Sequence, residues 1–400
     1  MLRKQNEKAI FIGCVDHSLN LCGQHAFAEN PQCVTFFGTI EAIYTFFSVS
    51  THRWDILLQH TGVSVKRLSQ TRWSAHYGAV KPISVNFDGL IAAIETLSNP
   101  EENWNTRASA RTLLPAVCDF AFLCYFYFWC DVLQEVDIVQ NYLQSKGLPL
   151  DKVITKLVAL EMFLMLERSN LVERAIEKAV SKSKEYDIPV DRRIRYIKKK
   201  FGDKPSEPGP TLEEEIRRGI MECIDVFYRE LQERSKSVKE VAKIFEAVMI
   251  KNLLSASEDY EKEVVKNLAN LYDEICEADL LLDIPRFRRH LIAAKINMDD
   301  ANNWTALDVL QFIVEWDFQE TLPNLTISLK LFLTVCVSVA SCERSFSKLK
   351  LIKSYLRSKM GQLRLNGLAL LSIEREQANV TDFDDVIRRF AAAKSRRIKI

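Results

Sequence analysis

Two Cys/His pairs in the stretch "GCVDHSLNLCGQH" are the first residues with a chemistry of their own. Cys14 and His17 have the spacing C-x-x-H, and Cys22 and His25 repeat it. Thiolates and imidazoles at this spacing are typical zinc ligands. On one continuous helix, however, the two pairs would lie about 12 Å apart, too far for a single ion. A single zinc site therefore requires a turn within "SLNL". Alternatively, the cysteines are thiols of the core and the histidines are hydrogen-bonded there. In a third interpretation, the stretch is a sequence block whose function involves the distant C-terminal part of the chain.

A basic run and a basic tail are the candidates for phosphate binding. The run "RRIRYIKKKF" alternates cations with Tyr196 and Phe201, and the tail reads "KSRRIKI". The 54 basic and 53 acidic residues nearly cancel, so any nucleic-acid surface must be local. The run is either a solvated helix face or a patch that contacts DNA, through Arg192, Arg193, Arg195, Lys198, Lys199 and Lys200.

An apolar stripe with one acid inside it marks the C-terminal part. Glu343 and Arg344 stand inside an apolar context, and the leucine-rich segment 363–373 follows. Helical spacing places one set of side chains on a common face, which we expect to be buried: Cys342, Phe346, Leu349, Ile352 and Leu356. One thin helix cannot bury so many apolar positions, so a partner surface within the chain or on another subunit is expected.

The sequence predicts that the secondary-structure elements positioning these residues are mainly helices. "KAIFIGC" (8–14) is a candidate strand, and most of the chain beyond it has apolar residues at helical spacing. "FAFLCYFYFWC" is too short to span a membrane and predicts a buried core helix. The Pro/Gly-rich linker 202–210 ends one part of the chain, and T-x-x-E and T-x-x-D capping boxes at Thr211 and Thr305 begin new helices. Ten scattered cysteines indicate reduced thiols.

Three stretches together resemble the hAT-type transposases. "SVASCERSFSKLKLIKSYLRSKMGQLRLNGLALLSIE" resembles their C-terminal dimerisation region, most closely that of relatives described as zinc finger MYM-type or TTF-type proteins. "CVDHSLNL" and "TRWSAHY" resemble the C-x-x-H and R-W blocks of the family. The resemblance implies a mainly α (α+β overall) chain: a truncated ribonuclease-H-like core interrupted by a large all-helical insertion. The expected parts are a partial core at 1–84, the insertion at 85–322, the dimerisation region at 323–378 and a basic tail at 379–400.

The resemblance also implies roles for individual residues. Glu343 matches the third acid of the family's Asp-Asp-Glu triad, and Cys14 and His17 match a block near the active centre. Arg72 and Trp73 match the pair expected near bound DNA, although Trp73 would equally serve as a core aromatic. We expect Glu343 to be partly buried and close to Cys14. The expected dimerisation residues are Phe346, Leu349, Ile352, Leu356, Leu368 and Leu371.

Both catalytic aspartates of the family precede its C-x-x-H block, but the thirteen residues before Cys14 contain no aspartate. Two-metal phosphoryl transfer needs several carboxylates, so we expect no enzyme activity, no cofactor and no metal. Mg²⁺ or Mn²⁺ would enter only if a further N-terminal part exists. We expect a nuclear, transposase-derived protein that acts by dimerising with itself or with related hAT-like proteins. DNA is a further candidate partner, and no membrane association is expected. The alternatives are part of an active transposase that lacks N-terminal exons, and a helical scaffold without nucleic-acid contact.

Overall fold

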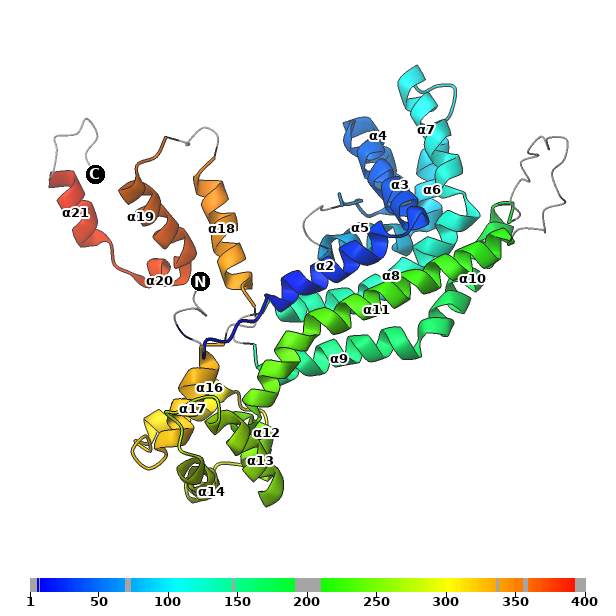
Figure 1. The fold of residues 1–400 in the computed structure, drawn as a ribbon. Coiled ribbons are helices and arrows are strands. Elements are labelled where there is room, and N and C mark those ends of the chain that lie inside the picture. The colour runs from blue at the N-terminus through cyan, green and yellow to red at the C-terminus, as the bar shows by residue number, and fades with distance from the viewer. Residues whose placement is uncertain are drawn as a thin grey trace. The chain divides into compact units, whose positions relative to one another are not determined.

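The computed structural model describes residues 6, 8–68, 73–145, 148–190, 210–335, 338–354 and 359–392. The chain divides into two compact units, 1–338 and 339–400, which are described separately. The described residues form helices and no strand (Figure 1). This confirms the prediction of a mainly helical chain.

The first part of unit 1 is a bundle of long helices. α8 packs against α10 and α5, and α11 packs against α2 and α9. The bundle helices are α2 (Val15–Ala28), α3 (Pro31–Ser48), α4 (Thr51–Thr61), α5 (Ser74–Val85), α6 (Phe87–Thr96), α7 (Trp104–Val117), α8 (Phe120–Leu143), α9 (Leu150–Leu166), α10 (Arg168–Glu185) and α11 (Leu212–Ile244).

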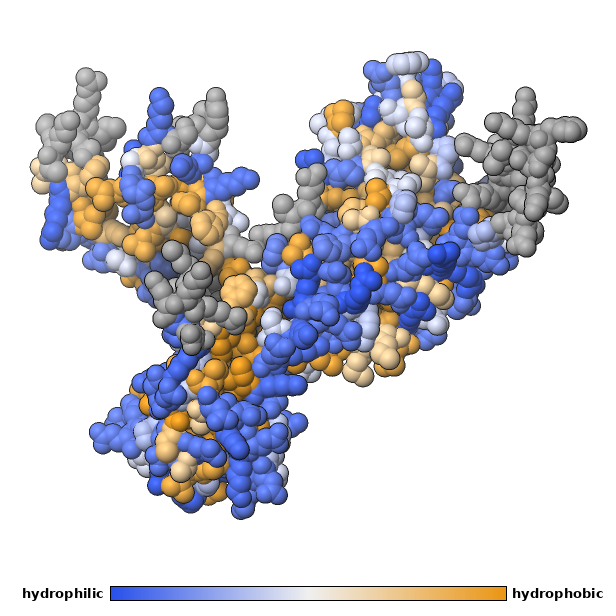
Figure 2. Space-filling model, in the orientation of Figure 1, coloured by the Kyte–Doolittle hydropathy of each residue, from blue (hydrophilic) through white to orange (hydrophobic). Residues whose placement is uncertain are grey.

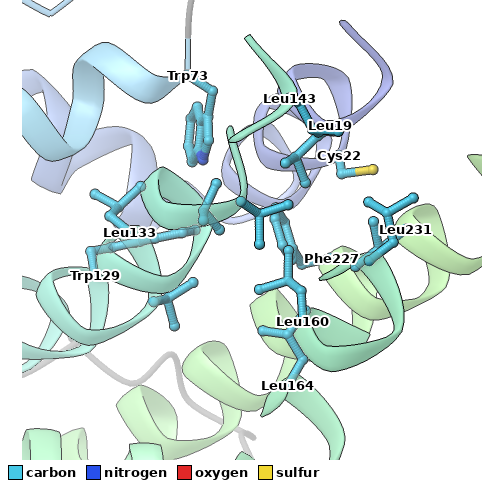
Figure 3. Packing of buried hydrophobic residues seen from close by; sticks show 14 of the residues in the cluster. Leu19, Cys22, Trp73, Trp129, Leu133, Leu143, Leu160, Leu164, Phe227 and Leu231 are labelled. Atoms are coloured by element: carbon cyan, nitrogen blue, oxygen red, sulfur yellow. The ribbon is translucent and has the colours of Figure 1, made fainter. Parts of the chain in front are cut away.

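The centre of this bundle is α8, the helix predicted from the aromatic run. Its apolar residues are buried on nearly all sides, among them Phe126 and Trp129. Leucines of α2, α8, α9 and α11 meet beside it (Figure 3). No single helix of the described part is long and apolar enough to cross a membrane; two bent pairs, α3 with α4 and α7 with α8, reach that length and composition only together.

Shorter helices follow α11 in unit 1. They are η1 (Glu246–Val248), α12 (Ile250–Ser255), α13 (Glu258–Ala269), α14 (Glu277–Ala293), α15 (Met298–Ala301), α16 (Ala306–Glu315) and α17 (Pro323–Leu333). The fully buried carboxylate of Asp283 on α14 holds this group together, because its Oδ2 accepts the first backbone N–H groups of α17. The donors are Asn324, at 2.9 Å, and Leu325, at 3.1 Å. A carboxylate at a helix N-terminus satisfies donors that have no partner within the helix.

Both predicted capping boxes are confirmed. The Thr211 N–H donates to Glu214 at 2.8 Å, and the Glu214 N–H donates back to the Thr211 hydroxyl at 3.2 Å. Thr305 and Asp308 make the same reciprocal pair at the start of α16. These two helix starts are therefore fixed by local side-chain chemistry.

The predicted strand at 8–14 is not formed, and this corrects the α+β description. Residues 9–14 lack regular secondary structure, and Ile10 and Ile12 pack against the helical core instead. A strand needs a neighbouring strand to pair its backbone groups, and none exists among the described residues. The expected ribonuclease-H-like core, which contains a sheet, therefore has no support here, and the helices between residues 15 and 85 pack in one core with those that follow.

The described residues of unit 2 form four helices: α18 (Ala340–Ile352), α19 (Gln362–Ile373), α20 (Arg375–Val380) and α21 (Asp384–Ala392). α18 packs against α19. The ammonium group of Lys348 joins them by donating to two carbonyls at the end of α19, those of Ser372 at 2.8 Å and Ile373 at 3.2 Å. A cation at this position also complements the negative end of the helix dipole.

Candidate functional site

The C-x-x-H block lies at the start of α2. Cys14 is the residue before the helix and is half-buried, whereas the side chain of His17 faces solvent. α2 runs without a break from Val15 to Ala28. The turn within "SLNL" that a single zinc site would require is therefore absent from this helix.

The second Cys/His pair separates into two different environments. Cys22 is fully buried, and burial raises the pKa of its thiol to about 12, so the thiol stays protonated. His25 is half-exposed and pairs with Glu230 of α11, with Nδ1 3.1 Å from the carboxylate. Within the described ranges, no group of three or more His, Cys, Asp and Glu side chains comes together as a metal site.

A buried amide joins the C-x-x-H block to the Trp73 block. The Oδ1 atom of Asn20 accepts the backbone N–H of Trp73 at 2.7 Å and the Nε2 group of Gln140 at 2.6 Å. Its Nδ2 group donates to the carbonyl of Asp16 at 3.0 Å. One side chain of α2 therefore connects its own helix to two segments that lie 53 and 120 positions from it in the sequence.

The Trp73 indole lies among the buried apolar side chains of the core (Figure 3). It is fully buried, and its ring centroid lies 4.1 Å from that of His76 and 5.6 Å from that of Trp129. Gly23 of α2 makes room for it, because a Cβ atom there would lie 2.3 Å from the indole. The structure thus gives Trp73 the role of a core aromatic, which was one of the two interpretations.

The predicted DNA contacts remain predictions. Stacking of Trp73 on a base would require the ring to leave the core, because its faces are covered here. Arg72 lies outside the described residues, as does the whole basic run, with Arg192, Arg193, Arg195, Lys198, Lys199 and Lys200.

Glu343 belongs to α18, but its side chain also lies outside the part that the structure describes. Its predicted burial and its predicted proximity to Cys14 stay predictions. The vestigial catalytic role assigned to it is likewise untested.

The apolar stripe of α18 and α19 is largely exposed within one chain. Phe346 is 70% exposed and Leu371 is 50% exposed, whereas Leu349, Ile352 and Leu368 are half-buried. The described part of one chain therefore does not cover this face of α18, and the prediction that another subunit covers it stays a prediction. Leu356 lies outside the described residues.

Further exposed apolar residues extend this surface beyond the predicted set (Figure 2). Leu363 is 90% exposed, Leu351 81% and Leu370 64%. None of the residues described in α19, α20 and α21 is buried. The spacing of Leu363 and Leu370 in the sequence was enough to place them on one helix face, because residues seven positions apart lie on the same side of a helix.

Comparison with known families identifies this part of the chain. Residues 287–377 match the model of the hAT family C-terminal dimerisation region. The match begins within α14 and ends within α20, so it includes the exposed surface of α18 and α19. The C-terminal part of the chain is thus similar to the dimerisation region of the hAT family, as the sequence motifs predicted.

Proposed function

We propose that this chain is a transposase-derived protein of the hAT type that acts by self-association through unit 2. The observation that carries the proposal is the exposed apolar surface of α18 and α19 within a segment that matches a dimerisation region. Monomeric proteins rarely leave an apolar surface of this size in water.

The size of the surface fits a dimer. The exposed apolar side chains of α18, α19 and α20 present several hundred Å² per copy, which is the scale of the ~800 Å² that each partner buries in a standard interface. They are Phe346, Leu351, Leu363, Leu370, Leu371, Ile373 and Val380. A second copy would remove these side chains from water, and burial of one leucine contributes about 1.5–3 kcal/mol.

We further propose that these 400 residues do not by themselves perform strand transfer, and that the protein acts in the nucleus. Support for the first statement comes from the sequence: the thirteen residues before Cys14 contain no aspartate, and this chemistry requires several carboxylates around two ions. Incubation of the chain with Mn²⁺ and labelled DNA tests it, because metal-dependent cleavage that disappears in Glu343→Gln would contradict it. Microscopy of a tagged chain tests the location.

Self-association is tested by placing charges on the exposed face of α19. Leu363 and Leu370 are exposed on the same face, so Leu363→Asp/Leu370→Asp adds two charges to the proposed interface without disturbing a buried core. The matched control is Met162→Asp/Met165→Asp, which changes two exposed apolar residues of α9 in unit 1.

Sedimentation velocity between about 1 and 100 μM should show a dimer of the unmodified chain and of the control. The α19 variant should be monomeric or bind at least about 100-fold more weakly, because two leucines lose about 3 kcal/mol or more of burial. A monomeric unmodified chain, or equal dimerisation of both variants, would refute the proposal.

A further inference from the structure

The octapeptide "FDDVIRRF" (383–390) lies beyond the matched dimerisation region; its last seven residues begin α21, and Phe383 directly precedes the helix. The Phe383 carbonyl accepts the Ile387 N–H at 2.9 Å, so its backbone is fixed to the first turn of the helix. Phe383, Val386, Ile387 and Phe390 follow the i, i+3, i+4, i+7 spacing of one apolar face. Their side chains are 38%, 58%, 47% and 55% exposed.

The octapeptide is also a charge-inverted palindrome: the types of its side chains are the same when read from either end, except that acidic residues in one half correspond to basic residues in the other. Read from either end, the order is aromatic, two charged residues and one β-branched residue, but the first pair is acidic and the second is basic. An antiparallel copy centred between Val386 and Ile387 would bring Phe383 level with Phe390 and the acidic pair level with the basic pair. A parallel copy would instead place the acidic pair beside the acidic pair of the partner helix, and the basic pair beside the basic pair.

We propose that α21 forms an antiparallel helix pair with α21 of a second copy of this chain. Side chains advance by about 100° per residue around a helix. Asp384 and Arg388 therefore lie on one side of the apolar face, and Asp385 and Arg389 lie on the other side. Around a two-fold axis, each acidic residue meets the arginine on the same side of the partner helix.

The four charged side chains are exposed to solvent, so a partner helix can reach them. Asp385 and Arg389 form an ion pair of 2.8 Å within the chain, and their side chains are 60% and 82% exposed. The partner's charges can join this pair without taking either group out of water. Such exposed pairs add little binding energy but exclude pairings of like charge.

The α21 pair cannot support a dimer alone. Its four apolar side chains expose roughly 300–400 Å² per copy, below the ~800 Å² per partner of a standard interface. The pair therefore adds to the surface of α18 and α19 and fixes the antiparallel direction. In this respect the inference rests on the proposed self-association of unit 2.

Charge exchange in the full-length chain tests the pair. Asp384→Arg/Asp385→Arg gives an α21 with four positive charges, and Arg388→Asp/Arg389→Asp gives one with four negative charges. Each variant alone should dimerise about tenfold or more weakly than the unmodified chain, because every charged pair between the two helices then has like charges. An equimolar mixture, with each variant labelled by a different fluorophore, should form heterodimers with nearly the original affinity.

The outcomes separate this inference from the proposed function. If both variants dimerise as tightly as the unmodified chain, or if the mixture is no tighter than either variant, the α21 pair is refuted while self-association of unit 2 stands. If the unmodified chain is monomeric up to about 100 μM, far weaker than a stable complex, both are refuted.

Discussion

The amide of Asn20 is the point at which the bundle is most sensitive to a small change. Asn20→Ala would leave the backbone N–H of Trp73 and the Nε2 group of Gln140 without their acceptor in the core. The Oε1 atom of Gln140 already has no hydrogen-bond partner among the described residues. Each additional buried donor without a partner costs about 1–2 kcal/mol, so the expected loss is about 2–4 kcal/mol.

Hydrogen exchange followed by mass spectrometry measures this loss locally, which matters because the chain has two units and need not unfold in one step. Peptides from α2 and α8 should exchange roughly 30- to 700-fold faster in Asn20→Ala than in the unmodified chain, as 1.4 kcal/mol corresponds to a factor of ten. Gln140→Leu in the same background should recover part of the loss, because it removes one donor without a partner.

The matched control is Asn141→Ala, which removes an exposed hydrogen bond of 2.8 Å to Asp137 on α8. Its effect should stay within about 0.5 kcal/mol. Equal exchange rates in Asn20→Ala and Asn141→Ala would refute the view that Asn20 holds three segments together.

Two further predictions concern packing and acid stability. Gly23→Ala should destabilise the bundle by about 1–3 kcal/mol in urea unfolding, because the new Cβ would lie 2.3 Å from the Trp73 indole. The control is Gly38→Ala, where a Cβ meets nothing within 4 Å. This control should be neutral or stabilising by up to about 1 kcal/mol. The hydrogen bond from Lys182 lowers the pKa of Asp88 in the folded chain, so the native state binds fewer protons than the unfolded state and this contribution is lost as pH falls below about 4. Asp88→Asn should therefore lose less stability between about pH 5 and pH 3 than the unmodified chain, and an identical loss would contradict the assignment.

Local chemistry explains which parts of the fold could be predicted from the sequence. The capping box of Thr211 and Glu214 depends on four neighbouring residues, and the burial of α8 follows from its unbroken run of apolar residues. The strand at 8–14 could not be decided in this way, because a strand forms only with a partner elsewhere in the chain. Ile10 and Ile12 are apolar enough for a strand and instead pack on helices.

The candidate site was predictable only in part for the same reason. The apolar stripe of α18 indicates that Phe346 packs against another apolar surface. The spacing of the residues alone does not say whether that surface belongs to the same chain or to another. The contact between Asn20 and Trp73 joins two blocks through tertiary structure, and a polar residue inside an apolar helix gives no indication of its partner. The charge-inverted palindrome of α21 lies in a segment that was interpreted only as a basic tail.

Cross-linking of isotope-mixed chains tests the central claim most directly. Chains of natural isotope content and ¹⁵N-labelled chains are mixed, treated with a lysine-specific cross-linker and analysed by mass spectrometry, so that a link between two chains carries both isotopes. Self-association through unit 2 predicts mixed-isotope links between exposed lysines beside the apolar surface, namely Lys350, Lys353 and Lys359. Mixed links confined to unit 1, for example at Lys152 and Lys262, or links within single chains only, would contradict it.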